Sequence, residues 1–170
     1  MRLIVCPGSA VDALLAGARV DHVLTLVSPD VEVGPRSIAT TVLRFNDIAA
    51  PRPGLIAPSL GTVQAIIDLG RAMPAEATLL VHCFAGVSRS PAAAYILACA
   101  AGAAGDEHAI AQRLRATSPK ATPNPLMISL ADDILKRGGV MSAAIGAIGR
   151  GTNAYEGDVI DWTLGDLTGG

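Results

Sequence analysis

Residues 79–95 read Leu-Leu-Val-His-Cys-Phe-Ala-Gly-Val-Ser-Arg-Ser-Pro-Ala-Ala-Ala-Tyr, and the rest of the chain is arranged around this stretch. Its first three residues are apolar and predict a buried strand, whereas the alanine-rich part from Pro91 predicts a helix. A tight loop between a strand and a helix N-terminus forms an anion-binding cradle, because free backbone N–H groups and the helix dipole converge there. The sequence therefore predicts an anion site between residues 82 and 90.

Hydrophobic periodicity predicts an α/β fold. Strands are expected over 3–6, 21–27, 41–45 and 78–81. Helices are expected over 9–18, 59–73, 91–101, 106–115, 125–137 and 140–148, with Ser9 and Ser59 as N-caps of the first two. Strands alternate with helices early and helices dominate late, which is typical of a mostly parallel central sheet of about four to five strands flanked by helices.

The length of 170 residues favours a single core. We predict a functional domain over residues 1–150 and a tail over 151–170 that is partly ordered by Trp162 and Leu164 packing onto the body. Hydrophobic residues make up 51% of the chain but aromatic residues only 3%, so small and aliphatic side chains should fill the core.

Charge and hydropathy narrow the classes of partner. The formal net charge of −2 shows no basic excess, so nucleic acid is not an expected partner. The longest apolar run, 92–104, is too short to span a bilayer, so no membrane association is expected. Three cysteines with no signal-peptide pattern favour a cytoplasmic protein without disulfide bonds.

The residues of the predicted cradle indicate chemistry on the bound anion. Cys83 supplies a thiol at the end of the strand, where backbone N–H groups stabilise a thiolate. Arg89 presents a planar fork suited to two oxygens of a tetrahedral oxyanion. Gly86 supplies the backbone freedom that a tight loop requires. The plainer alternative is a buried core cysteine followed by Ser90-Pro91 as an ordinary helix cap.

Residues 82–90, His-Cys-Phe-Ala-Gly-Val-Ser-Arg-Ser, resemble the His-Cys-x-x-Gly-x-x-Arg-Ser/Thr signature of the cysteine-based protein tyrosine phosphatase superfamily. The chain order resembles its dual-specificity and bacterial tyrosine phosphatase-like members. The resemblance implies that Cys83 is the nucleophile, that Arg89 binds the phosphoryl group and that the Ser90 hydroxyl stabilises the thiolate, with His82 beside them. It also implies that the phosphate is held by the loop residues Phe84, Ala85, Gly86, Val87 and Ser88 together with Arg89.

The cleavage of a phosphate ester requires a general acid for the leaving group. Asp47 is the first candidate, because it follows the predicted strand 41–45 and begins a loop rich in proline and glycine that is able to close over the site. Asp30 is a rival much farther upstream. Asn124 resembles an asparagine that supports the phosphate loop in dual-specificity members, and it is equally well placed as an N-cap.

These residues predict a phosphoric monoester hydrolase that works through a cysteinyl-phosphate intermediate and needs no cofactor or metal. Its expected partners are a phosphorylated protein or a small phosphomonoester, and a phosphate or sulfate ion is expected to occupy the site. The loop carries no lysine, which favours phosphotyrosine or a simple monoester over polyanionic substrates. Two alternatives stay open. One is a phosphate-binding pseudophosphatase, and the other is that Cys6 or Cys99 serves as a redox partner of Cys83.

Overall fold

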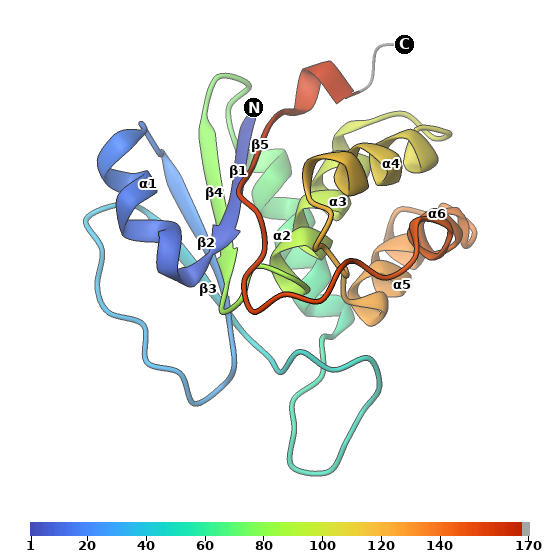
Figure 1. Cartoon of the computed structure of the whole chain (residues 1–170), viewed down its shortest axis with the longest axis horizontal. Helices are drawn as coiled ribbons and strands as arrows, with labels where there is room; N and C mark the ends of the chain where they lie inside the picture. The colour runs from blue at the N-terminus through green and yellow to red at the C-terminus, as the bar shows by residue number, and fades with distance from the viewer. Residues whose placement is uncertain (168–170) are drawn as a thin grey trace.

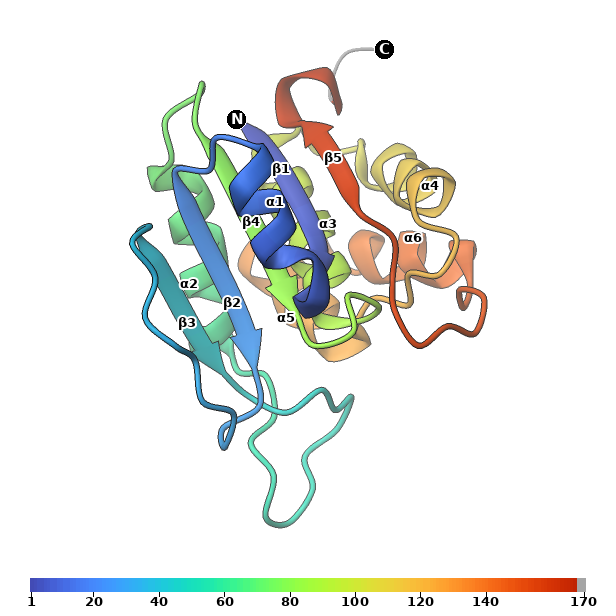
Figure 2. The same cartoon turned by 60° about the vertical axis from the view of Figure 1, so that its left-hand side comes forward.

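A computed structural model describes residues 1–167 of the chain. Five strands form one sheet in the order β3-β2-β4-β1-β5 (Figure 2). Their bounds are β1 Arg2–Pro7, β2 His22–Val27, β3 Thr40–Arg44, β4 Thr78–Cys83 and β5 Ile160–Thr163. The strands β1 to β4 run parallel to one another, and β5 runs antiparallel to β1. The predicted α/β fold with a mostly parallel sheet is therefore confirmed.

Helices cover both faces of this sheet (Figures 1 and 2). Their bounds are α1 Val11–Gly17, α2 Leu60–Ala72, α3 Arg89–Ala101, α4 Glu107–Thr117, α5 Pro125–Ile134 and α6 Val140–Ile148. Two short 3₁₀ turns, η1 Gly8–Ala10 and η2 Leu164–Leu167, complete the elements of residues 1–167. α1 packs with a small apolar cluster on one face, whereas the large core lies under the other helices.

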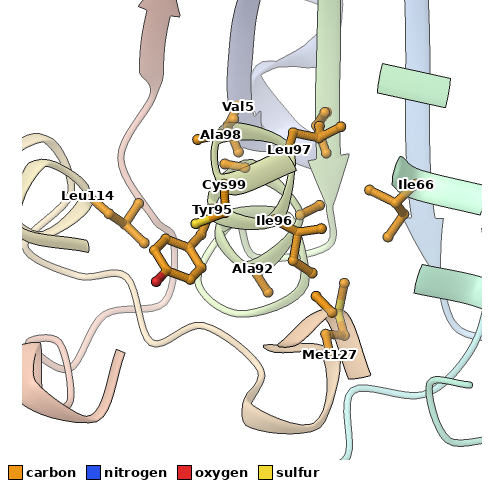
Figure 3. Packing of buried hydrophobic residues seen from close by; sticks show 14 of the residues in the cluster. Val5, Ile66, Ala92, Tyr95, Ile96, Leu97, Ala98, Cys99, Leu114 and Met127 are labelled. Carbon is orange, nitrogen blue, oxygen red and sulfur yellow. The ribbon is translucent and has the colours of Figure 1, made fainter. Parts of the chain in front are cut away.

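α3 is the central helix of the large core. Its residues from Arg89 to Cys99 are all buried, so it is apolar around its whole circumference beyond the first turn. In Figure 3, Ile66 of α2 lies to one side of α3 and Leu114 of α4 lies to the other. The one aromatic ring of the helix, Tyr95, keeps its hydroxyl satisfied by donating to the carbonyl oxygen of Glu107 at 3.1 Å. α3 is thereby held on all sides, which fixes the position of its N-terminus.

The strand β5 lies within the predicted tail, where the sequence pattern indicates no strand. It pairs with the edge strand β1, and Arg2 forms an ion pair of 2.6 Å with Asp161 across this edge. Trp162 and Leu164 are buried, as predicted. β5 has only four residues, and two of them face the core. This alternation is too short to be recognised as a strand in a glycine-rich part of the sequence. Residues 168–170 of the predicted tail lie outside the described residues.

The structure tests the predicted helix starts. Ser59 is the N-cap of α2 and accepts a hydrogen bond from the Thr62 amide at 3.2 Å, as predicted. The prediction for Ser9 is wrong, because η1 occupies this position and Ala10 is the N-cap residue of α1. The plainer interpretation of Ser90 as a helix cap is also wrong, since α3 begins at Arg89 and Ser90 lies inside its first turn.

Candidate active site

The predicted anion loop lies where the parallel strands end. We call residues 83–89 the anion loop. Cys83 is the last residue of β4, and Arg89 is the first residue of α3. In an open parallel sheet, ligands bind at the carboxyl ends of the strands, and here a helix N-terminus points at the same place. The fold therefore places the loop where backbone geometry favours an anion.

Four carbonyl groups of the anion loop are held from outside by amides of three separate segments, with Thr122 and Asn124 in the same connection between α4 and α5. These hydrogen bonds are Gly8 N to Phe84 O at 3.0 Å, Gly157 N to Ala85 O at 2.7 Å, Thr122 N to Val87 O at 2.8 Å and Asn124 N to Ser88 O at 3.4 Å. In a trans peptide the N–H points away from the C=O, so the following amides face the inside of the loop. The surrounding chain thus turns the loop into an inward-facing ring of donors.

The thiol of Cys83 lies inside this ring. Its Sγ accepts a hydrogen bond from the Gly86 amide at 3.3 Å and lies 3.2 Å from the hydroxyl oxygen of Ser90. Gly86 has a φ of 72°, and a Cβ there would lie 2.7 Å from the nitrogen of Pro7. Glycine is therefore required at this position for both its conformation and its lack of a side chain. The Gly86 amide and the Ser90 hydroxyl thus contact the sulfur of a residue that is only 3% exposed.

The guanidinium of Arg89 is buried beside this loop and only partly paired. The side chain is 6% exposed, and its Nη1 donates to the carbonyl oxygen of Phe45 at 3.1 Å. Within the described residues its Nε has no hydrogen-bond partner. A buried donor without a partner requires an explanation, and beside the anion loop a bound oxyanion supplies one. His82 Nδ1 and Trp162 Nε1 are likewise without a partner in the described residues. Arg89 is thus arranged to accept an oxyanion from the solvent side.

The ring of His82 faces β2 rather than the anion loop. Its Nε2 lies 2.9 Å from the hydroxyl of Thr25 and 3.4 Å from Nη1 of Arg36. Arginine only donates, which favours Nε2 as an acceptor and a neutral ring. The proton is then on Nδ1, which has no hydrogen-bond partner in the described residues. Burial, followed by the nearby charge of Arg36, lowers the pKa of His82 to about 4. His82 therefore stays uncharged at neutral pH and supports the end of β4.

This lowered pKa predicts an acid sensitivity of the fold. As the pH falls from about 6.5 to about 4, the unfolded chain takes up a proton at His82 that the folded chain refuses. The free energy of unfolding should therefore decrease through this window, and above it His82 should contribute no pH dependence. Urea unfolding at a series of pH values measures the effect. His82→Gln should weaken the dependence, whereas His108→Gln on the exposed side of α4 should keep it; equal curves for both variants would contradict the prediction.

Asp47 lies next to the anion loop, at the start of the loop after β3. Its Oδ1 accepts hydrogen bonds from the Ser88 hydroxyl at 2.8 Å and from Asn124 Nδ2 at 2.7 Å. The preceding residue, Asn46, closes the base of the same loop by pairing with Ile56 through both its backbone and its side chain. The structure thus brings Asp47 to the loop that carries Cys83. Asp30 lies exposed after β2 and forms no hydrogen bond with the anion loop in the described part of the chain.

Asn124 combines two roles that the sequence presents as alternatives. Its Oδ1 accepts from the Met127 amide at 3.0 Å and so caps α5. Its Nδ2 donates to Asp47 and also to the carbonyl oxygen of Ile48 at 3.2 Å. The side chain therefore supports the loop of the candidate acid, while its backbone amide supports the anion loop through Ser88.

Two variants separate these roles of Asn124. Asn124→Ala removes the cap and the donor to Asp47, so we expect a loss of about 1 kcal/mol in the free energy of unfolding. Asn124→Ser keeps a capping oxygen but cannot reach Asp47. Both variants should lower kcat for a phosphate ester with a poor leaving group by about tenfold, which is less than the roughly 10²–10⁴-fold of a complete general acid, because Asp47 is misplaced and not removed. Chemical unfolding and steady-state rates test this, and unchanged kcat in Asn124→Ser would show that the cap is the only role.

Cys6 does not face Cys83, and Cys99 lies near the C-terminal end of α3, the helix whose first residue is Arg89. Cys6 belongs to the apolar cluster under α1, whereas Cys83 belongs to the large core on the opposite face of the sheet. A disulfide between them would require their Cβ vectors to converge, which opposite faces prevent. Burial raises the pKa of both Cys6 and Cys99 to about 12. The structure therefore favours the interpretation of both as buried structural thiols over the redox alternative.

Several contributors to the site carry no recognisable signal in the sequence. Gly8, Thr122 and Gly157 act only through backbone amides, which every non-proline residue possesses. Arg36 and Thr25 reach His82 from the β2 side, which only the strand register reveals. Within the described residues, no group of three or more histidine, cysteine, aspartate or glutamate side chains is arranged to hold a metal.

Solved structures with the same architecture identify the fold. DUSP15 superimposes with a TM-score of 0.59 at 17% identity over 86% of this chain and 89% of its own. Human DUSP28 gives a TM-score of 0.56 at 20% identity over 83% of this chain and 94% of its own. The chain has the fold of the dual-specificity phosphatases. A mouse putative dual specificity phosphatase complexed with zinc tungstate gives a TM-score of 0.50 at 20% identity over 82% of this chain and 80% of its own.

The similarity to these proteins is found in the structure and not in comparisons of the whole sequence. No protein-family model matches the chain, and no curated protein sequence matches it either. In residues 1–167, none of the helices has the length and apolar character that crossing a bilayer requires. What relates this chain to the dual-specificity phosphatase fold is therefore its tertiary structure.

Proposed function

We propose that this chain is a phosphoric monoester hydrolase of the protein tyrosine and dual-specificity phosphatase type that works through a cysteinyl-phosphate intermediate. One observation carries the proposal: the sulfur of Cys83 faces two donors inside the anion loop, beside a buried Arg89 whose Nε has no partner in the described chain. The sulfur is suited to act as a nucleophile, and Nε of Arg89 is free to donate to an oxyanion.

In the first chemical step the Cys83 thiolate attacks phosphorus, an S–P bond forms and the P–O bond to the leaving group breaks. Asp47 donates its proton to the leaving oxygen. The inward-facing amides of the loop and the guanidinium of Arg89 stabilise the charge on the three remaining phosphoryl oxygens. The Ser90 hydroxyl, buried beside the sulfur, donates to the thiolate.

In the second step a water molecule attacks the phosphorus while the Asp47 carboxylate accepts its proton. The S–P bond breaks, the electron pair returns to Cys83 as thiolate, and inorganic phosphate leaves. The proton that Asp47 lost in the first step is thereby restored. Ser88 and Asn124 donate hydrogen bonds to Oδ1 of Asp47. They therefore keep the carboxyl group in position for both steps.

The anion class rests on the shape of the loop and on one comparison. Tungstate is a tetrahedral oxyanion like phosphate, and the mouse protein of the same fold is described with zinc tungstate. We infer that a phosphate or sulfate ion occupies the anion loop here when no substrate is present. The proposed substrates are phosphorylated proteins or small phosphomonoesters.

Hydrolysis of 4-nitrophenyl phosphate by the wild type and by Cys83→Ser tests the proposal. Wild type should turn over, Cys83→Ser should not, and Cys99→Ala, which alters a buried thiol of α3, should resemble wild type. In Asp47→Asn the second step should become slow, so acid quenching should trap phosphate covalently on the protein. Equal rates for wild type and Cys83→Ser would refute the enzyme. If phosphate then still raised the Tm, the chain would be the alternative phosphate-binding pseudophosphatase.

A further inference from the structure

The anion loop opens into a cavity of about 370 Å³. Cys83, Arg89 and the exposed Phe84 line it on the side of the anion loop. Its opposite wall is the connection between β2 and β3, residues 28–39. A volume of this size suits the leaving group of a small ester or one side chain, within the range of about 300–1,000 Å³ for ligand pockets. The wall of this cavity therefore contacts whatever the phosphoryl group is attached to.

The connection between β2 and β3 is unusual, because two parallel strands are joined here without a helix. Figure 2 shows it running back along the sheet as an open trace. The side chain of Arg44 holds its first part through the carbonyl oxygens of Pro29 and Val31. This extended segment takes the place of the helix that usually joins two parallel strands. Its side chains thus reach the cavity at fixed places.

Arg36 lies on this wall as a second cation beside Arg89. Its Nη1 donates to the Thr25 hydroxyl at 3.3 Å and lies 3.4 Å from His82 Nε2, and both of these partners are neutral. Throughout residues 1–167 no carboxylate forms an ion pair with Arg36. A guanidinium has five N–H donors and favours bidentate pairing with carboxylate or phosphate, so most of its capacity is free.

The remaining charge on this wall comes from Glu32, which is exposed and also lines the cavity. The charged groups that face the cavity are therefore Arg36 and Arg89 against Glu32, since His82 is neutral. The positive charge of Arg89 is required to bind the phosphoryl group. Arg36 is the surplus cation on the wall of this cavity.

We propose that Arg36 binds a second acidic group of the substrate, a carboxylate or phosphate located on the leaving-group side of the phosphoryl group being cleaved. This inference rests on the proposed function and specifies its substrate class. Arg36 touches substrate and not the reacting atoms, so it determines specificity. The acidic group belongs either to a small ester or to a residue next to the phosphorylated side chain of a protein.

Paired substrates that differ in one carboxylate test the proposal. The values of kcat/KM are measured for phenyl phosphate and for 3- and 4-carboxyphenyl phosphate. Arg36→Gln should lower kcat/KM for the better carboxyphenyl ester about tenfold more than for phenyl phosphate, as lost pairing with a charged group predicts. Glu32→Gln should shift the preference in the opposite direction. Arg71→Gln, which removes a charge from exposed α2 surface, should leave the ratio unchanged.

A binding measurement separates failure of this inference from failure of the proposed function. Calorimetric titration of Cys83→Ser with phosphate and with pyrophosphate should show that Arg36→Gln weakens pyrophosphate about tenfold more than phosphate. If the wild type hydrolyses phenyl phosphate and Arg36→Gln loses the same factor for every substrate, the role of Arg36 is overturned and the phosphatase activity stands. If Arg36→Gln weakens pyrophosphate selectively but the wild type hydrolyses none of the esters, the phosphatase activity is overturned and the role of Arg36 in binding stands. A phosphotyrosyl peptide with glutamate or glutamine beside the phosphotyrosine then distinguishes the two sources of the acidic group.

Discussion

Arg89→Lys is expected to lower kcat/KM for 4-nitrophenyl phosphate by about a hundredfold to a thousandfold, the usual effect of losing one pre-arranged donor to a developing oxyanion. The amine of lysine keeps the charge and can still reach the carbonyl oxygen of Phe45. It cannot offer that contact and a planar pair of donors to phosphate at once. The inhibition constant of inorganic phosphate should rise together with the loss in rate.

Steady-state kinetics and phosphate inhibition measure this effect, with Arg71→Lys as the matched control at an exposed position of α2. The Tm of Arg89→Lys should be recorded as well, because the guanidinium also lies 5.9 Å from the ring centre of Phe45. A loss smaller than tenfold in a folded variant would show that charge alone suffices. The unpaired Nε of Arg89 would then not act as a donor to phosphate.

Gly157→Ala is expected to disturb the active site from a place that the sequence does not connect with it. A Cβ on Gly157 would overlap the carbonyl oxygen of Gly86. The Gly157 amide also holds the oxygen of the Ala85–Gly86 peptide, and the N–H of this same peptide faces the sulfur of Cys83. The overlap would push Gly86 away, and its N–H, which faces the thiolate, would move with it. We expect kcat to fall by tenfold or more and stability to fall by about 1–3 kcal/mol, as in other overpacked sites.

Gly146→Ala on α6 is the control for this substitution, because no heavy atom lies within 4 Å of the Cβ it would add. It should leave kcat unchanged and raise the Tm slightly, since alanine favours a helix over glycine. Chemical unfolding and kcat are compared for the two variants. If Gly157→Ala loses stability but keeps wild-type kcat, the segment after α6 supports the fold without shaping the anion loop.

The sequence predicts the elements whose signals are local. A run of apolar residues before a glycine-containing loop indicates β4 and the start of α3, and alternation of strands and helices indicates the α/β class. The cap at Ser59 is a short-range interaction and is confirmed. Ser9 fails as a cap because β1 continues to Pro7 and the next amide pairs with Phe84, which lies in another element. At this position a tertiary hydrogen bond determines the backbone conformation, and the capping preference of serine does not.

The candidate site divides along the same line. Cys83, Gly86, Arg89 and Ser90 lie within one short stretch, so their spacing alone places them around one loop. The role of Asn124 stays open in the sequence, since a cap and a loop support use the same residue type. The structure shows the cap through Oδ1, whereas Nδ2 donates to Asp47 and the anion loop is contacted by the Asn124 backbone amide.

By itself, the sequence determined the class of fold, the loop between β4 and α3 and the residue types that suit attack on phosphorus, because all of these depend on neighbours along the chain. Only the tertiary structure decided that Gly157 and Thr122 hold the loop, that Cys6 faces away from Cys83 and that Arg36 shares a cavity with Arg89. The physical reason is that backbone amides carry no identity in the sequence. In addition, the side of a sheet on which a residue lies is set by strand register, which forms only when distant segments pair.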